Sequence, residues 1–395
     1  MNKKISFLSL LLLSLLSISL FFVYPYSTES SYRNSEPDDI QHAAISSEEK
    51  LPWPHQRPGI SQDEYENLIE NLWIINNYGL YQASEDKSLA YFHDGLDIVV
   101  ENGTKLYSVE SGYVKSGVTS GYIIIGDTEG DRPGNGWLYA HVNNIQFQEG
   151  DYIYQGDYIA DVYFLGLSHV HLNRVFLENG SWNDIENINC VCPDKYFYYV
   201  DTQPPVIRTP FSYFQNNTDI FFEDINPTVV RGDVDIVVGM RDQGEFAHSK
   251  DFGFGDRLCV TRIEYEISGN NIQPVYKKSF DFTKIIINNL ELYGRERVFT
   301  VFKHYKIFHP FGITGDKVFS YYIITNTDGT GEFGKIDLSA QDYAWNTAAV
   351  DASGNPRFPD GQYTITVKAW DFLGNCSMAS DIVEVRNVKK GRIRR

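Results

Sequence analysis

The sequence has 395 residues and carries 52 acidic against 34 basic side chains, a formal net charge of −18. Because electrostatic attraction to phosphate dominates nucleic-acid binding, this acidic excess argues against nucleic acid or anionic lipid as a partner. The 27 tyrosines and 25 phenylalanines are consistent with a β-rich architecture.

The N-terminus has a segment typical of exported proteins. Lys3 and Lys4 precede an almost wholly apolar run over residues 7–24, close to the minimum of ~17 residues that can span a bilayer. Residues 1–26 are therefore predicted to be a signal peptide or an uncleaved membrane anchor, and the sequence leaves the choice open. In either case the rest of the chain is expected to be exported, to the periplasm, the cell envelope or the extracellular space.

A linker and a helix are predicted next. Residues 27–60 are polar and contain scattered prolines, a composition typical of a linker. Over residues 61–78 apolar side chains recur with a helical period, and Ser61 can serve as the N-cap. We expect this helix to pack against the domain that follows it.

Histidines gather in three short clusters further along the chain. The clusters are His93-Asp94-Gly95-Leu96-Asp97, Tyr139-Ala140-His141 and His169-Val170-His171, whereas the other histidines are scattered singly. Histidine nitrogens and a carboxylate oxygen are the ligands of catalytic Zn²⁺, which keeps a fourth position for water. The clusters therefore predict a zinc site.

The spacing of the third cluster favours a strand. His169 and His171 are separated by one residue, so on a β-strand both imidazoles project from the same face. Val170 and Leu172 would then face the opposite, apolar side.

The first cluster is predicted to lie at a strand entrance. His93 and Asp97 are four residues apart, which one face of a helix could also explain. However, Gly95 interrupts that turn, and residues 96–100 form an apolar, β-branched run typical of a buried strand. The H-E-x-x-H motif of helical metallopeptidase sites is absent from the sequence.

In their order along the chain, these motifs resemble those of the lysostaphin/LytM-type zinc endopeptidases, which cleave peptide bonds in bacterial peptidoglycan. That family has H-x-x-x-D, then Y-A-H, then H-x-H, and the three clusters match them in this order. Residues 103–114 are similar to its G-T-x-V-x-A…G-x-V strands, and residues 149–157 to its x-G-D-x-V-x-x-G-Q turn. The resemblance covers about residues 75–180, under a third of the chain.

The resemblance implies a role for each matched residue. His93, Asp97 and His171 match the family's metal ligands, so one Zn²⁺ per chain is expected. His169 matches the general base, and His141 matches the second catalytic histidine, which positions water or stabilises the tetrahedral intermediate. The implied activity is hydrolysis of peptidoglycan peptides by a metal-activated water, without a covalent enzyme intermediate.

Two alternatives stay open. Where active relatives have a Gly- and Thr-rich loop before the H-x-H, this chain has Tyr163, Phe164 and Leu165, which is expected to alter the substrate groove. A peptidase acting on a protein outside the cell wall is therefore one alternative. The other is a non-hydrolytic, zinc-containing scaffold or regulator of the cell envelope, which would not require His169 and His141.

The chain contains four cysteines, none near the histidine clusters in sequence, namely Cys190, Cys192, Cys259 and Cys376. In an exported protein an even number of cysteines predicts one or two disulfides, whose connectivity cannot be deduced from the sequence. Cys190 and Cys192 are spaced too tightly for a C-x-x-C zinc knuckle.

The C-terminal half, residues 203–388, is predicted to be an immunoglobulin-like β-sandwich. Pro204 and Pro205 favour an extended boundary before it. Residues 233–239 and 361–371 alternate polar and apolar side chains, and the second run resembles the end of bacterial immunoglobulin-like modules. Because about 185 residues exceed a ~100-residue module, either a long insertion or a second module is expected.

The predicted fold class is mainly β. An antiparallel-sheet zinc peptidase domain with a short leading helix, residues 61–200, precedes the immunoglobulin-like β-sandwich region. The basic run at residues 389–395 is predicted to be a solvated tail. The sequence indicates no oligomeric state, and residues 7–24 are a possible membrane tether.

Overall fold

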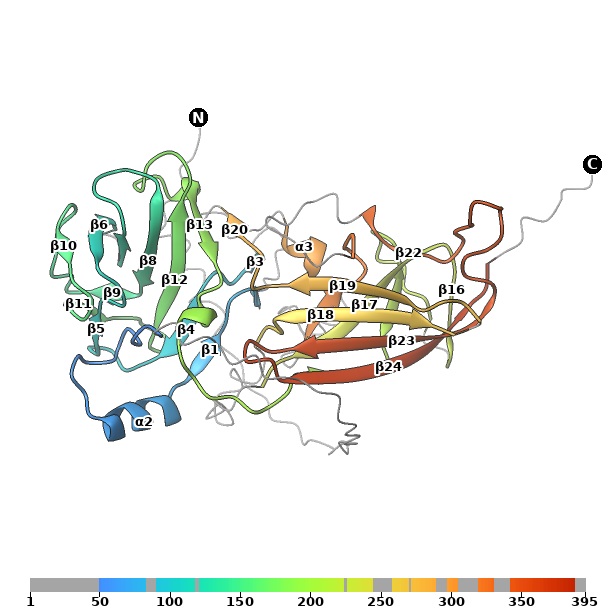
Figure 1. Ribbon diagram of the computed structural model, residues 1–395, viewed down its shortest axis with the longest axis horizontal. Coiled ribbons are helices and arrows are strands. Elements are labelled where there is room, and N and C mark those ends of the chain that lie inside the picture. Colours follow the sequence, from blue (N-terminus) through green and yellow to red (C-terminus); the bar gives the residue numbers. More distant parts are fainter. Residues whose placement is uncertain are drawn as a thin grey trace, which may run out of the picture.

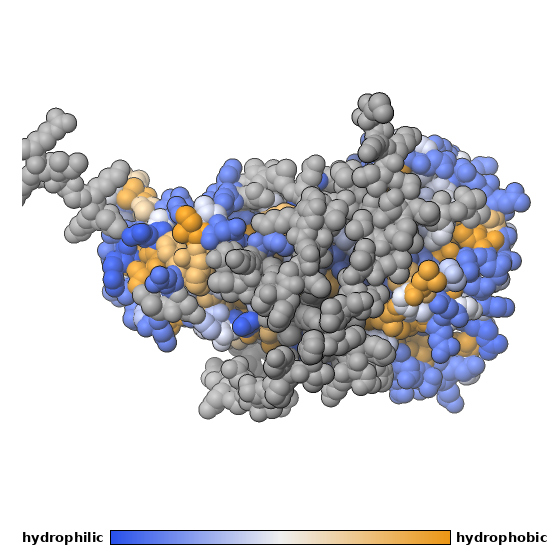
Figure 2. All heavy atoms as spheres, turned by 180° about the vertical axis from the view of Figure 1, so that it is seen from behind, coloured by the Kyte–Doolittle hydropathy of each residue, from blue (hydrophilic) through white to orange (hydrophobic). Residues whose placement is uncertain are grey.

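A computed structural model describes most of the chain: residues 50–82, 90–117, 121–223, 226–243, 258–269, 271–288, 297–304, 319–329 and 342–387. The predicted signal peptide or membrane anchor, the first part of the predicted linker and the basic tail lie outside these residues. No helix in the described ranges is long and apolar enough to cross a membrane. The described surface seen from behind is largely hydrophilic, with smaller apolar patches (Figure 2).

A nine-stranded sheet forms most of the N-terminal half (Figure 1). Its strands follow the order β1-β4-β12-β8-β7-β6-β10, while β13 pairs with β12 and β20 pairs with β13. The strand bounds are β1 (Ile74–Asn76), β4 (Leu96–Val99), β6 (Gly112–Ser116), β7 (Tyr122–Gly126), β8 (Gly134–Ala140), β10 (Tyr152–Ile153), β12 (His169–Leu177), β13 (Ile188–Val191) and β20 (Ile287–Asn288). All of these pairs are antiparallel, as predicted for this half.

A smaller sheet packs on one face of the large one. It consists of β5 (Lys105–Tyr107), β11 (Tyr158–Val162) and β9 (Val142–Asn143). Leu106 and Ile159 of the small sheet share a buried core with Val170 and Leu172 of β12. Val170 and Leu172 therefore point into an apolar core, as the alternation along this strand predicts.

Two five-stranded sheets form the C-terminal half. The first contains β14 (Val206–Ile207), β15 (Ser212–Gln215), β17 (Asp233–Arg241), β21 (Ser320–Ile323) and β22 (Trp345–Asn346). The second contains β16 (Thr228–Val230), β18 (Arg262–Ser268), β19 (Val275–Asp281), β23 (Gly361–Trp370) and β24 (Cys376–Val385). Apolar side chains of both sheets share one core, so the predicted mainly β fold class is confirmed, while the immunoglobulin-like topology stays a prediction.

The two halves lie side by side along the long axis of the molecule and share buried contacts (Figure 1). Strand β20, from the C-terminal half of the sequence, pairs with β13 and extends the large sheet. Tyr78 and Leu80 belong to the same hydrophobic core as Phe282 and Ile285. The predicted domains are therefore joined by a buried interface.

Several short elements complete the description. They are α2 (Gln62–Glu70), α3 (Val298–Val301), the 3₁₀ turns η3 (Ile185–Asn187) and η4 (Asp194–Tyr196), and the hairpin of β2 (Tyr81–Gln82) with β3 (Tyr91–Phe92).

The leading helix is shorter than the predicted span of residues 61–78. Ser61 caps α2 as predicted, in a capping box with Glu64. The helix ends at its C-cap Asn71, and Ile74 pairs with Ile98 of β4. The apolar residues after the helix therefore belong to a strand. Pairing with the buried, β-branched Ile98 stabilises this segment more than another helical turn would.

The end of the predicted linker packs on the N-terminal half. Trp53 is 1% exposed, stacks on Phe197 with ring centres 4.6 Å apart, and donates from Nε1 to the carbonyl oxygen of Tyr198. This segment thus contributes Trp53 to the core of this half, with Leu51 packed against that core.

The expected disulfides are absent, because all four cysteines lie within the described residues and are free thiols. Cys190, Cys192 and Cys259 are buried, while Cys376 is exposed. Cys190 Sγ faces Asn173 and Asp94, whereas Cys192 Sγ faces Asp194, so the two sulfur atoms have different partners. The buried thiols act as small apolar side chains.

Candidate metal and catalytic site

Strands β4 and β12 position the three predicted metal ligands. Asp97 of β4 lies opposite His171 of β12 in the register of the pair, and His93 lies just before β4 begins. Gly95 allows the segment before β4 to lie close to β12, because a Cβ at this position would lie 2.5 Å from the carbonyl oxygen of Leu172. His93 and Asp97 thus lie at a strand entrance, as predicted.

The ligand atoms of these residues meet at one point. His93 Nε2 lies 3.1 Å from both Asp97 Oδ1 and His171 Nδ1, and His171 Nδ1 lies 2.6 Å from Asp97 Oδ1. His93 and Asp97 are buried, and His171 is nearly so. Two imidazole nitrogens and one carboxylate oxygen in contact form the donor set of a catalytic zinc site, so these residues fit a Zn²⁺ ion.

The outer nitrogen of each histidine contacts an oxygen acceptor. His93 Nδ1 donates to the backbone carbonyl oxygen of Asn77 at 3.0 Å, so Nε2 is the nitrogen that faces Asp97. His171 Nε2 donates to Asp94 Oδ1 at 3.0 Å, so Nδ1 faces the same point. Contacts of this kind orient ligand histidines and select the nitrogen that binds the metal.

The charges in the cluster favour a cation. Burial would raise the pKa of Asp97, but the nearby histidines, His93, His169 and His171, hold it well below its usual value. Burial lowers the pKa of His171, but the carboxylates of Asp97 and Asp94 outweigh it and raise this pKa to about 10. A positive charge is therefore stabilised between the two carboxylates, and a bound metal ion can supply it in place of the proton.

The two predicted catalytic histidines lie beside these ligands. His169 Nε2 is 3.7 Å from Asp97 Oδ1, and His169 Nδ1 donates to the carbonyl oxygen of Leu167 at 2.7 Å. The ring centre of His141, directly after β8, lies 4.6 Å from that of His169 and 6.1 Å from that of His171. The structure therefore brings all five predicted site residues together.

His141 is held neutral by its surroundings. Burial and the nearby histidines lower its pKa well below the usual value. Its backbone is in the left-handed region, with φ of 63°, which directs the side chain from the strand end toward His169. His141 Nδ1 is buried and has no hydrogen-bond partner among the described residues.

Phe164 covers both of these histidines. Its ring centre lies 4.4 Å from that of His141 and 4.7 Å from that of His169, and the side chain is 8% exposed. Asn102 holds the loop in place: Phe164 N donates to Asn102 Oδ1, and Asn102 Nδ2 donates to Phe164 O, both at 2.8 Å. The altered loop predicted from the sequence therefore lies directly on the site.

Three contacts around the site were not predicted from the sequence. Asp94 could have been suspected, because it follows His93 directly and is a carboxylate. Asn77 carries no local signal, since its contact with His93 arises only when the segment after β1 folds back. Phe164 belongs to the loop that the sequence marks as altered, but its stacking on His141 depends on the tertiary structure.

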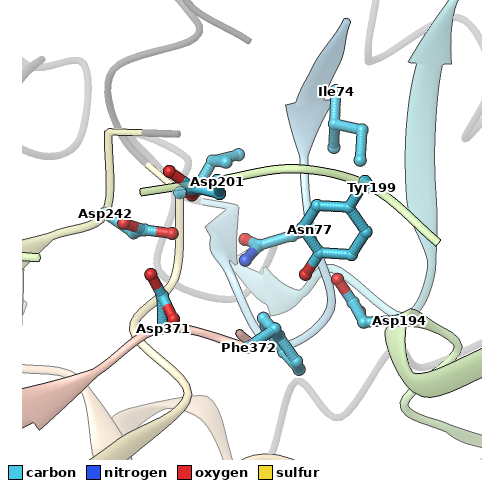
Figure 3. Close-up of a pocket in the computed structure, with 9 residues that line it drawn as sticks. Ile74, Asn77, Asp194, Tyr199, Asp201, Asp242, Asp371 and Phe372 are labelled. Carbon is cyan, nitrogen blue, oxygen red and sulfur yellow. The ribbon is translucent and has the colours of Figure 1, made fainter. Parts of the chain in front are cut away.

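A second group of potential ligand atoms lies at the boundary between the halves (Figure 3). Carboxylate oxygens of Asp201, Asp242 and Asp371 lie within 4.8 Å of one another, and all three residues are buried. Figure 3 shows them on one side of a cavity, with Asp194 and Tyr199 on the other. Burial raises the pKa of Asp371, and it raises the pKa of Asp194 to about 7.

These carboxylates also stabilise local turns. Asp371 accepts hydrogen bonds from the backbone N–H groups of Leu373 and Asn375 in the β23–β24 connection. Asp201 accepts one from the backbone N–H of Gln203, and Asp242 accepts one from the next backbone N–H along the chain. Such short-range bonds are a common reason for aspartate in turns.

Comparisons with known proteins point to the N-terminal half. Residues 91–183 match the model of Peptidase family M23. No curated protein matches the sequence.

Several solved structures are similar to part of the chain. The catalytic domain of the antimicrobial peptidase lysostaphin from Staphylococcus simulans is 19% identical, with 30% of this chain and 87% of that one covered and a TM-score of 0.24. The catalytic domain of a point mutant of the prophage-encoded M23 protein EnpA from Enterococcus faecalis is 20% identical, with coverages of 32% and 91% and a TM-score of 0.23. A chain of the SpoIIQ–SpoIIIAH pore forming complex is 13% identical, with coverages of 32% and 85% and a TM-score of 0.24.

The matched range begins two residues before His93 and extends beyond His171, so it contains all three histidine motifs. The family resemblance of these motifs is thereby confirmed by the match of residues 91–183 to Peptidase family M23.

Proposed function

We propose that this protein is an exported, zinc-dependent endopeptidase that hydrolyses peptide bonds in peptidoglycan. The observation that carries the proposal is the convergence of five side chains on one point. Three of them present metal-ligand atoms, and the other two are histidines directly beside those atoms. The match of this region to a peptidase family supports the same assignment.

We assign His93 Nε2, Asp97 Oδ1 and His171 Nδ1 as the ligands of one Zn²⁺ per chain. The bound ion would supply a water of lowered pKa and polarise the scissile carbonyl group. Asn77 and Asp94 hold the outer nitrogens of the two histidines, so the inner nitrogens stay directed at the metal position.

His169 is assigned as the general base. Its Nδ1 proton is donated to the carbonyl oxygen of Leu167, so Nε2 carries the lone pair and faces the site. A neutral imidazole in this position can accept a proton from water and pass it to the leaving amine. The Leu167 contact keeps the ring in the tautomer that this proton transfer requires.

His141 is assigned as the second catalytic histidine. Burial keeps its ring neutral, and one ring nitrogen has no partner among the described residues. A neutral imidazole at this distance from His169 can donate a hydrogen bond to the oxygen that becomes negatively charged during hydrolysis.

The substrate class rests on the family and on the predicted compartment. The apolar run at residues 7–24 after Lys3 and Lys4 supports export, with either cleavage or a membrane tether. An exported member of this peptidase family would meet peptidoglycan peptides as its most abundant substrate. Phe164 narrows the site beside His141 and His169, and it is expected to limit which peptides can bind.

The same Phe164 contact favours a second candidate function. A ring stacked on both catalytic histidines restricts the space in which a scissile carbonyl group could lie. A zinc-containing envelope scaffold or regulator that does not hydrolyse peptides would tolerate this contact.

The first experiment measures zinc per chain and the release of new amino groups from purified peptidoglycan, with and without a chelator. We expect about one zinc per chain and release that the chelator abolishes. His169→Ala is the matched variant, because it removes the base and leaves all three ligands; it should keep zinc and lose hydrolysis. Zinc binding without release by the wild-type chain would favour the scaffold, and full activity of His169→Ala would exclude the mechanism.

A further inference from the structure

The segment between β1 and β2 supports one of the proposed zinc ligands. Asn77 O accepts the Nδ1 proton of His93 at 3.0 Å. Gly79 N donates to His93 O at 2.7 Å, and His93 N donates to Leu80 O at 2.8 Å. Both the backbone and the ring of His93 are therefore held by residues 77–80.

The side chain of Asn77 is in turn held by the C-terminal half. Its Nδ2 donates to the carbonyl oxygen of Cys259 at 3.0 Å, and its Oδ1 accepts from the N–H of Cys259 at 2.7 Å. Asn77 is 3% exposed and Cys259 is fully buried. The amide thus binds the backbone of a distant residue through two bonds, as a neighbouring strand would.

Tyr78 is fixed by the same half of the molecule. Its hydroxyl group lies 3.0 Å from the carbonyl oxygen of Ile285 and accepts from the N–H of Ile287 at 3.1 Å. It also lies 2.9 Å from the carbonyl oxygen of Cys190 in β13, which pairs with β20. The residue after Asn77 therefore lies where the sheets of the two halves join.

Gly79 completes the contact. Its φ of 83° is in the region that favours glycine, and a Cβ there would lie 2.3 Å from a ring carbon of Phe282. Three consecutive residues, Asn77, Tyr78 and Gly79, are thus packed by the C-terminal half immediately beside His93.

We propose that Asn77 is a positioning residue through which the C-terminal half orients His93 in the zinc site. The C-terminal half would then be part of the support of the metal site, in addition to any role as a spacer or binding module. The inference rests on the zinc site of the proposed function, although it does not depend on the substrate.

Asn77 can affect zinc binding because the direction of the His93 imidazole determines how well it binds the ion. A ligand histidine binds a metal well only when its lone pair points at the ion, and the acceptor on the other nitrogen sets that direction. Here the acceptor is a backbone carbonyl group whose position depends on the Asn77 side chain. Without the two hydrogen bonds to Cys259, the carbonyl group of Asn77 could rotate, and its hydrogen bond with His93 Nδ1 would weaken.

The test compares Asn77→Ala with Asn326→Ala in the full chain. Asn326 is a matched control, because it is buried and donates from Nδ2 to a backbone carbonyl oxygen, that of Thr300, within the C-terminal half. The readouts are the zinc dissociation constant from competition with a chelator, the visible spectrum of the Co²⁺-loaded protein, and the Tm of each metal-free protein.

We expect Asn77→Ala to weaken zinc binding about 10- to 100-fold, the range for residues that orient metal ligands, and to alter the Co²⁺ bands. Asn326→Ala should lower Tm without changing either metal readout. Asn77→Ser can keep at most one hydrogen bond to Cys259 and should give an intermediate zinc affinity. If Asn77→Ala does not fold, Asn77→Ser decides the question by the same readouts.

A folded Asn77 variant with wild-type zinc affinity and Co²⁺ spectrum would overturn the inference. Failure of the proposed function is distinguishable from this result. Wild-type protein that binds zinc but leaves peptidoglycan intact would refute the hydrolysis proposal, whereas the affinities would still decide the role of Asn77. Wild-type protein that binds no zinc would overturn both.

Discussion

Two clusters of potential ligand atoms lie in the described part of the molecule, and they differ in how their side chains are held. In the first, Asn77 and Asp94 bind the outer nitrogens of His93 and His171, so the inner nitrogens meet Asp97. The second consists of three aspartates, each of which accepts a hydrogen bond from a nearby backbone N–H group.

Closeness of the ligand atoms does not by itself distinguish the two clusters. Both clusters bring three such atoms within 4.8 Å. Only the first combines nitrogen and oxygen donors suited to zinc with outer contacts that direct them. In the second, all donors are carboxylate oxygens, and each aspartate accepts a hydrogen bond from a backbone N–H group in a local turn.

The largest effect is expected from removal of a metal ligand in the first cluster, and a substitution in the second cluster should leave zinc binding intact. Asp97→Ala removes the carboxylate shared by His93 and His171, so zinc affinity should fall by more than the ~100-fold typical of residues that only orient ligands, and hydrolysis should be lost. Asp371→Asn should keep about one zinc per chain and wild-type hydrolysis. Metal analysis after gel filtration and the peptidoglycan assay measure both. A loss of zinc in Asp371→Asn would show that the second cluster contributes to metal binding.

A smaller effect is expected at Asp94. Asp94→Ala removes the acceptor of His171 Nε2 and should weaken zinc binding about 10- to 100-fold. Asp94→Asn retains an oxygen acceptor and should lose less zinc affinity than Asp94→Ala. Cys190→Ala is the control, because its Sγ lies 3.9 Å from Asp94 Oδ2, which is not the oxygen that His171 contacts. Equal zinc affinities for Asp94→Ala and wild type, measured by chelator competition, would exclude this role.

The smallest effect on the metal site is expected at Asp194, which lines the cavity beside the second cluster and should affect stability instead of zinc binding. Burial raises the pKa of Asp194 to about 7, above its unfolded value, so the folded state binds more protons between about pH 4 and 7. The contribution of Asp194 to the free energy of unfolding should therefore be largest below about pH 4 and decline as the pH rises to about 7, by about 4 kcal/mol at most. Asp194→Asn should show a weaker decline in urea unfolding across this range. Identical pH dependence in both proteins would contradict the prediction, and zinc content should not change.

Much of the candidate site could be predicted from the sequence. Residue type and spacing placed His169 and His171 on one strand face and His93 with Asp97 at a strand entrance, because these patterns depend on local backbone geometry. The capping box at Ser61 is equally local. The predicted helix was too long because Ile74 pairs with Ile98, a contact that a helical period cannot reveal.

The predicted disulfides were wrong for a related reason. An even number of cysteines indicates bridges only when the fold brings the sulfur atoms together, and here the sulfur atoms of the three buried thiols contact different residues, Asp94, Asp194 and Tyr322. Cysteine count is a property of the sequence, whereas sulfur geometry is a property of the tertiary structure.

The mainly β fold class, the resemblance to a peptidase family and the five residues of the candidate site can all be read from the amino-acid sequence, since they follow from motifs and short-range periodicity. The surroundings of that site can be read only from the folded chain. Asn77 contacts His93 from 16 positions away and Cys259 from 182 positions away. Such contacts depend on how the two halves pack, and packing between distant segments leaves no periodic pattern in the sequence.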